Sequence, residues 1–345
     1  MVNHTFDDTN THEIFPFEIK NDNGTMSNKF PEIKDRHVFV GPKNYCFAAS
    51  YKDVASKLYN FEARPDDVWI LGFPRSGTTL TSELVWLLGN NLDYQKASET
   101  VMDLRFPVLE GAAYFCQDYE RITAQRQLYK GETAEIAEKL SKPAWESLSE
   151  TREKRFIKTH LPLSLAPSNI LTSGCKVIYL ARNPKDVCVS SYLLLNSYKT
   201  VGIDESFDKF WNYFHHGLVP CTPYFEHVKE AWEAKDNPNV LFVFYENYSK
   251  DMELTIRTLA RFLGKKIADS DVHTLIEHVK IDNFRKNKSV NSDHLRELGI
   301  LKDTNDSFIR KGVVGGWNEF FQEHVDVEAD NWINENLKMT RLKFS

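Results

Sequence analysis

The feature that most constrains the fold is a short apolar run followed at once by a glycine-containing loop, at residues 68–79. The run Val68–Leu71 predicts a buried strand, and the loop Gly72–Gly77 predicts a sharp turn. From Thr78 onward, apolar residues recur at the spacing of a helix. A strand, a glycine loop and a helix N-terminus in this order predict an anion site, because backbone N–H groups and the helix dipole point into the loop.

The polar side chains of this loop suit the same ligand. The spacing of Gly72 and Gly77 fits a nucleoside-triphosphate loop, but Thr78 stands where that motif requires lysine. The basic residue lies inside the loop instead. On this stretch alone, a tight strand-to-helix turn without a ligand is the alternative interpretation. The side-chain donors available to a phosphate or sulfate are those of Arg75, Ser76, Thr78 and Thr79.

Composition excludes several classes of protein. The chain has 345 residues, of which 41% are hydrophobic and 27% charged, as in a globular protein with a sizeable core. The net charge of −6 argues against nucleic acid as the main partner, since duplex binders carry a basic face. No apolar run approaches the ~20 residues of a membrane span, and Met1–Lys20 lacks the pattern of a signal peptide.

The five cysteines are scattered and form no C-x-x-C pair or zinc-binding spacing. We therefore expect a cytoplasmic protein with reduced thiols, no bound metal, and no membrane or nucleic-acid partner.

Further apolar runs predict more strands, at residues 155–160, 176–181 and 240–245, with helices between them. Residues 207–234 have a helical pattern, and an amphipathic helix begins near Met252. Apolar strands alternating with helices predict one α/β domain over residues 36–345, with a parallel sheet covered by helices on both faces. Residues 1–35 are predicted to form a flexible tail.

In such a sheet, ligands bind beyond the carboxyl ends of the strands. This rule places Arg75, His160, Arg182 and Tyr245 along one edge. His160 is the histidine whose neighbourhood suggests catalysis, because imidazole accepts a proton near neutral pH. Arg182 and Ser190 flank a strand-to-helix junction that suits a phosphate, although an ordinary ion pair and a surface hydroxyl fit as well.

Residues 106–154 are harder to interpret. They fit either a surface excursion or a mobile cover over a hydrophobic pocket. In the second case Phe106, Leu109 and Tyr114 are candidates for an apolar acceptor pocket.

Four segments, taken together, resemble the cytosolic sulfotransferase family. The loop GFPRSGTTL is similar to the family's 5′-phosphosulfate loop YPKSGTTW, and Lys158–Pro162 matches KTHLP. The segment YLARNPKDV with Ser190 resembles the 3′-phosphate segment, and residues 310–317 match RKGxxGxW. The resemblance covers roughly residues 36–340. Arg75 and the segment TPYFEHVKEAW resemble the insect branch of the family, which includes retinol dehydratase.

The resemblance implies a co-substrate, 3′-phosphoadenosine 5′-phosphosulfate (PAPS), with the bisphosphate PAP as product, and requires no metal. It implies that His160 is the general base and that Lys158 and Arg75 stabilise charge on the sulfuryl group and leaving oxygens. The implied nucleotide contacts are Arg75, Ser76, Gly77, Thr78, Thr79, Leu80, Arg182, Ser190, Tyr245, Arg310, Lys311 and Gly312.

The chain also departs from the family pattern. Arg75 replaces the loop lysine, Leu80 replaces the loop tryptophan, and Ile281 stands where a phenylalanine flanks the adenine. Arginine cannot donate a proton here, because its pKa exceeds ~12. The family's dimer motif is not visible after Trp317, so the resemblance gives no oligomeric state.

We therefore expect sulfuryl transfer from PAPS to the hydroxyl of a small hydrophobic acceptor such as a phenol, a sterol or another alcohol. Elimination through a transient sulfate ester, as in retinol dehydratase, is the close variant. A P-loop kinase or ATPase is disfavoured by Thr78. A non-catalytic carrier of hydrophobic small molecules is the alternative from another class.

Overall fold

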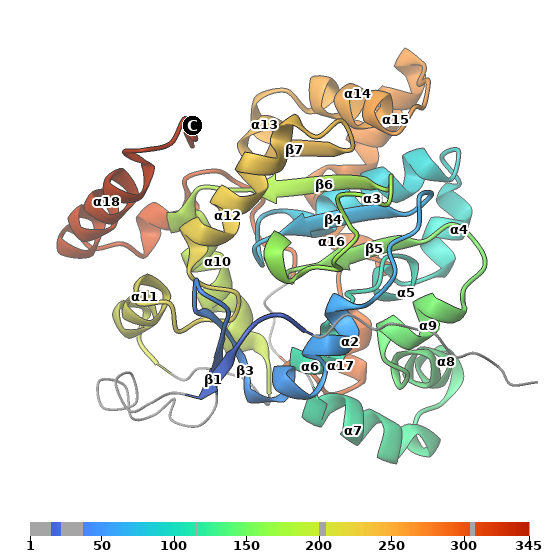
Figure 1. Cartoon of the computed structure of the whole chain (residues 1–345). Coiled ribbons are helices and arrows are strands. Elements are labelled where there is room, and N and C mark those ends of the chain that lie inside the picture. Colours follow the sequence, from blue (N-terminus) through green and yellow to red (C-terminus); the bar gives the residue numbers. More distant parts are fainter. Residues whose placement is uncertain (1–14, 22–36, 115, 200–204, 304–307, 345) are drawn as a thin grey trace, which may run out of the picture.

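A four-stranded parallel sheet with the strand order β5-β4-β6-β7 lies at the centre of the molecule (Figure 1). The computed structural model describes residues 15–21, 37–114, 116–199, 205–303 and 308–344. The register places Ile70 beside Lys158 on one side and Ile178 on the other. The four predicted strands of the parallel sheet are confirmed. They are β4 (Val68–Gly72), β5 (Phe156–Thr159), β6 (Lys176–Ala181) and β7 (Val240–Phe244).

Each face of this sheet is buried in its own hydrophobic core. Val68 and Ile70 of β4 point into a core shared with α3, α14 and α15, while Trp69 and Leu71 point into a second core shared with α11 and α12. Alternate residues of a strand face opposite sides, so a strand that is apolar throughout must be covered twice. The predicted α/β class, with helices on both faces, is therefore confirmed.

Most helices follow the predicted alternation with strands (Figure 1). The helix predicted to begin at Thr78 is confirmed as α3. The described helices are α2 (Ala55–Tyr59), α3 (Thr78–Gly89), α4 (Tyr94–Glu99), α5 (Met102–Arg105), α6 (Gly111–Tyr114), α7 (Cys116–Gln125), α8 (Gly131–Leu140), α9 (Ala144–Glu150), α10 (Pro184–Ser197), α11 (Phe207–His215), α12 (Tyr224–Glu233), α13 (Glu246–Lys250), α14 (Met252–Phe262), α15 (Asp269–Val279), α16 (Ile281–Lys286), α17 (Asp293–Glu297) and α18 (Glu323–Leu337).

The helical stretch predicted at residues 207–234 is two helices, α11 and α12, and not one. Gly217 follows α11 with a φ of 77°, a left-handed conformation that ends a helix and favours glycine. Pro223 precedes α12 and has no N–H to continue a helical ladder. Both helices have apolar residues at helical spacing, so the periodicity of the sequence did not reveal the break between them.

A second sheet, antiparallel and three-stranded, was not predicted. Its strands are β1 (Ile19–Asn21), β2 (His37–Val40) and β3 (Tyr45–Ala48). β1 lies inside the predicted tail, and Ile19 pairs with Val40 while Phe15, Phe17 and Ile19 pack against the main core. For residues 15–21 the structure therefore differs from the expectation, because three apolar side chains hold them. The rest of the predicted tail lies outside the described residues.

The segment 106–154 packs against the edge of the parallel sheet. Val108 forms a parallel bridge with Lys158, in which Leu109 N donates to Lys158 O (2.8 Å) and Lys158 N donates to Pro107 O (2.9 Å). Helices α6 to α9 follow, and several of their residues line the cavity described below. The first part of this segment is thus tied to the sheet and is not a free excursion.

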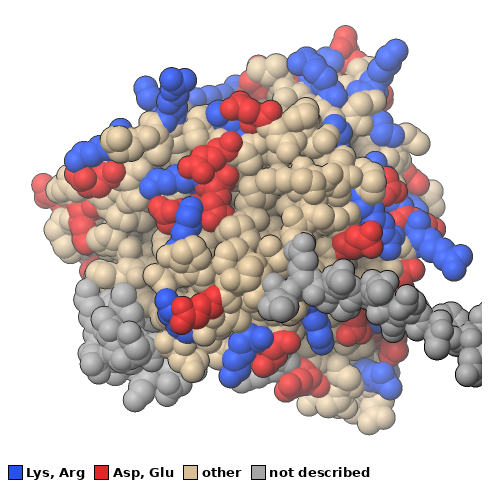
Figure 2. Space-filling view, in the orientation of Figure 1, with Lys and Arg blue, Asp and Glu red and all other residues tan. Residues whose placement is uncertain are grey.

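The surface carries charges of both signs. Figure 2 shows basic and acidic side chains interspersed on one face, with no large area of a single sign. Among the described residues, no helix is both long and apolar enough to cross a bilayer.

A buried ion pair joins the ends of β4 and β5 that lie farthest from the glycine loop. Arg155 donates to both carboxylate oxygens of Asp67, at 2.8 and 2.5 Å, and their side chains are 1% and 0% exposed. Asp67→Ala is expected to lower the free energy of unfolding by about 3–5 kcal/mol, because it leaves the guanidinium buried without its counter-charge. Urea unfolding measures the loss. An effect below ~1 kcal/mol would contradict this role.

Candidate active site

The loop after β4 has the backbone of an anion cradle. Arg75 and Gly77 adopt positive φ angles of 73° and 99°, and Ser76 N donates to Phe73 O (3.1 Å) to close the turn. α3 starts directly afterwards, so the N–H groups of Thr78 and Thr79 have no partner within the helix. These donors and the helix dipole meet at one point, as the sequence predicted.

Gly77 allows an aromatic ring to pack on the loop. A Cβ atom at Gly77 would lie 2.3 Å from Cδ2 of Tyr245, which follows β7. The Tyr245 ring also stacks on the guanidinium of Arg182, 4.4 Å from the ring centroid, and its hydroxyl donates to Gly312 O (3.3 Å). Segments that are far apart in the sequence therefore meet around one ring.

Arginine side chains gather beside the loop. Arg75 Nε donates to Ser190 Oγ (2.9 Å), and Arg182 Nη1 donates to Arg75 O (3.2 Å). Burial, together with repulsion from Arg182 and Arg310, lowers the pKa of Arg75 to about 10. Like charges this close are stable only when an anion compensates them, so the cluster suits a phosphate.

A C-terminal loop docks against this cluster. The Asp186 carboxylate on α10 accepts from Gly315 N (2.9 Å) and Trp317 N (3.2 Å), and Arg182 Nη2 donates to Val313 O (3.2 Å). Arg310 and Gly312 line the cavity, whereas Lys311, which also lines it, is half exposed and paired with Glu319 (2.5 Å). The described part of this loop thus closes one side of the arginine cluster.

His160 lies at the end of β5 with its ring oriented by the neighbouring strand. Its Nδ1 lies 2.7 Å from Gly72 O, and a carbonyl only accepts, so Nδ1 carries the proton and Nε2 keeps a lone pair. Burial lowers the pKa of His160 to about 3, and the nearby charges of Lys158 and Arg75 act in the same direction. The ring is therefore neutral near pH 7 and can accept a proton.

The backbone of His160 is held on both sides by residues that the sequence did not single out. His160 N donates to Glu110 Oε1 (2.6 Å), and His227 Nε2 donates to His160 O (3.0 Å). Thr159 Oγ1 donates to the other oxygen of Glu110 (2.7 Å). Glu110 lies in the segment 106–154, for which the sequence allowed two interpretations. His227 lies within a helical pattern that predicts burial and no function. No local signal distinguishes either residue.

Lys158 is a buried cation without a direct partner. Its residue is 6% exposed, and among the described residues its ammonium has no hydrogen bond or ion pair. Burial lowers the pKa of Lys158, while the charges of Asp103 and Glu110 oppose the shift. An unpaired buried ammonium is costly, so this position favours an anionic ligand.

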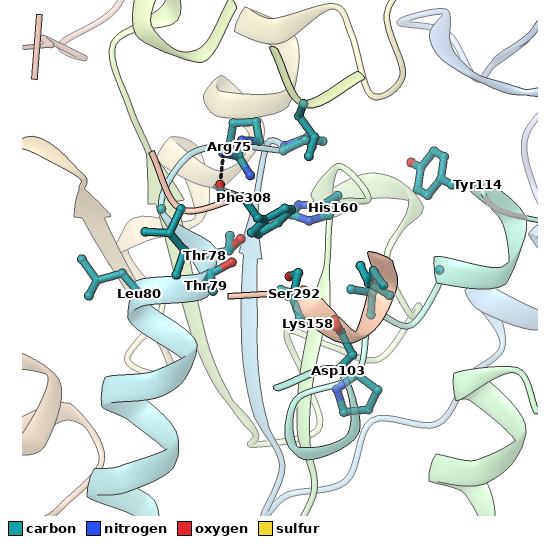
Figure 3. Close-up of a pocket in the computed structure, with 18 of the residues that line it drawn as sticks. Arg75, Thr78, Thr79, Leu80, Asp103, Tyr114, Lys158, His160, Ser292 and Phe308 are labelled. Carbon is teal, nitrogen blue, oxygen red and sulfur yellow. Dashed lines mark hydrogen bonds between the residues drawn. The ribbon is translucent and has the colours of Figure 1, made fainter. Parts of the chain in front are cut away.

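One cavity of about 2070 Å³ connects these groups (Figure 3). Its described lining contains most of the predicted site: Arg75, Gly77, Thr78, Thr79, Leu80, Tyr114, Lys158, His160, Arg182, Ser190, Tyr245, Arg310, Lys311 and Gly312. Ser76 is fully buried and does not belong to the lining, because its side chain turns into the protein.

The prediction for the acceptor pocket needs correction at two positions. Phe106 and Leu109 are fully buried in the two cores on either side of the sheet and do not line the cavity. Their neighbours Pro107 and Val108 line it instead. Tyr114 does line it. Other apolar and aromatic residues of the cavity lining are Phe73, Ile122, Tyr213, Leu218 and Val219.

The wall of the cavity beside the glycine loop is also partly apolar. Leu80 and Ile281, two of the departures from the family pattern, both line the cavity together with Tyr245. Ile281 Cδ1 lies 3.0 Å from where a Cβ on Gly312 would be, so the two residues are in close contact. No cluster of three or more potential metal ligands occurs in the part of the chain that the structure describes.

Gly77→Ala tests the cradle. The new methyl group collides with Tyr245, and alanine is strained at this φ, so binding of 3′,5′-bisphosphate nucleotide should weaken at least tenfold by calorimetry. Gly131→Ala is the matched control, because Gly131 also has a positive φ (57°) but has open space around it. Equal binding by both variants would contradict the packing argument.

Comparison with known proteins agrees with this geometry. A sulfotransferase domain model matches residues 65–341. The chain is 34% identical to sulfotransferase 1E1 of Bos taurus over 297 residues, which are 85% of this chain and 92% of the relative. It is 31% identical to luciferin sulfotransferase of Photinus pyralis over 313 residues, which are 88% and 80% of the two chains.

Two solved structures are similar over almost their whole length. A retinol dehydratase in complex with retinol and PAP superposes with a TM-score of 0.86 at 39% identity, covering 96% of this chain and 99% of the other. A retinol dehydratase in complex with androsterone and the inactive cofactor PAP gives a TM-score of 0.85 at 39% identity, with coverages of 95% and 98%.

Proposed function

Because this chain belongs to the sulfotransferase family and is thus a PAPS-dependent enzyme, we propose that its acceptor is a small hydrophobic alcohol, such as a phenol or a sterol. One observation carries the proposal. A single cavity joins the arginine cluster, the neutral His160 and the buried Lys158 to a wall of apolar and aromatic side chains. The structures with retinol and androsterone, in relatives 39% identical, support an acceptor of this class.

The residues present fit PAPS. Arg182 Nε is a buried atom without a partner in the described structure, and the Lys158 ammonium has no hydrogen bond or ion pair there. PAPS, when bound, supplies the sulfuryl group. The first turn of α3, with Thr78 and Thr79, would hold the 5′-phosphate. Arg182, Ser190 and residues 310–312 would hold the 3′-phosphate and so select against ATP, which lacks that group.

In this proposal His160 Nε2 takes the proton from the acceptor hydroxyl as the oxygen attacks. The hydrogen bond from Nδ1 to Gly72 O fixes the tautomer of the ring. Because its pKa is low, the ring stays neutral at pH values well below the ordinary histidine pKa of ~6.5 and can accept a proton there. Lys158 and Arg75 would compensate the negative charge that develops on the sulfuryl and leaving oxygens. Preorganised donors of this kind contribute about 3–4 kcal/mol each in comparable sites.

A close variant of this reaction is sulfuryl transfer followed by elimination. Sulfuryl transfer to an allylic alcohol would give a sulfate ester that can then lose sulfate and a proton, as the retinol dehydratase neighbours suggest. Incubation with retinol and PAPS distinguishes the two outcomes, because the variant yields anhydroretinol and the default yields a stable ester. A non-catalytic carrier would yield neither product, although it would still bind the acceptor.

His160→Ala should lower the rate of transfer about 10²–10⁴-fold, because it removes the proton acceptor. Binding of PAP, measured by calorimetry, should stay unchanged. His273→Ala, which replaces an exposed histidine on α15, is the control. Substantial residual turnover with a good acceptor would exclude His160 as the base.

Arg182→Ala should weaken binding of PAP by about 2 kcal/mol or more, roughly 30-fold, while binding of AMP changes little. The difference arises because only PAP carries the 3′-phosphate. Calorimetric titrations with both nucleotides measure it. Equal weakening of both would contradict the assignment of Arg182 to the 3′-phosphate.

A further inference from the structure

A second, water-sized cavity is lined in part by Lys158. Its volume is about 20 Å³, which is enough for one water molecule. The lining residues that carry polar side chains are Thr79, Asp103, Lys158, Ser289, Ser292 and His294. Figure 3 shows Asp103, Ser292 and Lys158 close together on the side of the main cavity next to His160. Neither sequence pattern nor family resemblance assigns a role to Asp103, Ser292 or His294.

Asp103 is held in place by a histidine from a distant part of the chain. His294 Nε2 donates to Asp103 Oδ2 at 2.9 Å, and His294 is 5% exposed. His294 Nδ1 is buried and has no partner among the described residues. A buried polar atom without a partner costs about 1–3 kcal/mol, so a water in the adjoining cavity would relieve this cost.

The Asp103 carboxylate carries a negative charge. Burial alone would raise the pKa of Asp103, but the hydrogen bond from His294 and the charges of His294, Lys158 and Arg105 hold it below the ordinary value. Asp103 is therefore ionised wherever the enzyme is expected to work. It forms no direct ion pair with Lys158 within 4.0 Å, which leaves room for one bridging water.

The ammonium of Lys158 is subject to opposing influences. Burial and the charge of Arg75 disfavour its protonated form, while Asp103 and Glu110 favour it. Glu110 is the weaker support, because both of its oxygens are occupied by Thr159 and His160 and burial raises its pKa to about 7. The remaining neighbours are His160, which is neutral, and His294, which faces Asp103.

We infer that Asp103, oriented by His294, is a positioning residue for Lys158: through one bridging water it fixes the ammonium and maintains its positive charge. This inference rests on the proposed function, in which Lys158 acts on the sulfuryl group. The ammonium must stay protonated in its buried position to do so. Asp103 supplies a negative charge beside the ammonium, since Asp103 and Lys158 line the same small cavity.

The test is the pH profile of Asp103→Asn, which keeps the shape of the side chain and an acceptor for His294. The alkaline limb of kcat/KM should move to lower pH by about one unit, because Lys158 loses the negative charge that most favours its protonated form. Asp103→Glu restores the negative charge, so its alkaline limb should return most of the way to the pH of the wild type. Asp67→Asn is the control, since it neutralises a buried carboxylate far from the site and should lower Tm without moving the limb.

A second readout does not depend on activity. With lysine labelled at the ε-carbon, NMR follows the titration of Lys158, whose resonance is assigned by its loss in Lys158→Arg. The midpoint should be lower in Asp103→Asn than in the wild type. Asp103→Ser, a smaller neutral variant, provides the same comparison if Asp103→Asn does not fold.

An unchanged midpoint in both neutral variants would overturn the inference, as would an equal shift in Asp67→Asn. A shifted midpoint in a protein that transfers no sulfuryl group to any hydrophobic alcohol would support the placement of Asp103 and overturn the proposed function instead.

Discussion

The hydrogen bond between His160 Nδ1 and Gly72 O is the interaction on which the rest of the site depends. It exists because β4 and β5 are parallel neighbours in register, with Leu71 beside Thr159, so that the two strands end together. The end of β4 leads into the anion-binding loop, and the end of β5 carries the imidazole of His160. The bond also selects the tautomer, since it leaves Nε2 free to accept a proton. Glu110 and His227 hold the same strand end from opposite sides, so three packed elements preserve one ring orientation.

Buried positive charge is the second constraint. Arg75 and Lys158 lie at strand ends where burial and repulsion from neighbouring cations oppose their charged forms. The protein offsets part of this cost with acidic groups near the cations: Asp186 near Arg182, and Asp103 and Glu110 near Lys158. An anionic ligand in the cavity would offset the rest. This arrangement explains how a chain with a net charge of −6 presents a strongly positive interior site.

The parallel sheet and the nucleotide loop were predictable because their signals are local. An apolar run, a glycine loop and a helical period lie within about a dozen residues, and the four strand ends follow from the rule for parallel sheets. The antiparallel sheet was missed because β1 is three residues long and pairs across a gap in the sequence. Phe106 and Leu109 were assigned to the pocket because composition gives hydrophobicity but not the face of an extended segment.

The sequence by itself determined the family, the class of fold and the kind of ligand. It also named many of the residues that line the cavity beside the glycine loop, since each lies in a contiguous motif. Tertiary structure alone decided what surrounds them. Asp103 and His294 are 191 residues apart, Glu110 and His160 are 50 apart, and Gly77 and Tyr245 meet only when β7 joins the sheet. Such contacts depend on how the elements pack against one another, and no periodic pattern in the sequence reports which distant residues will meet. The supporting charges and the wall of the acceptor pocket therefore emerge only in the folded chain.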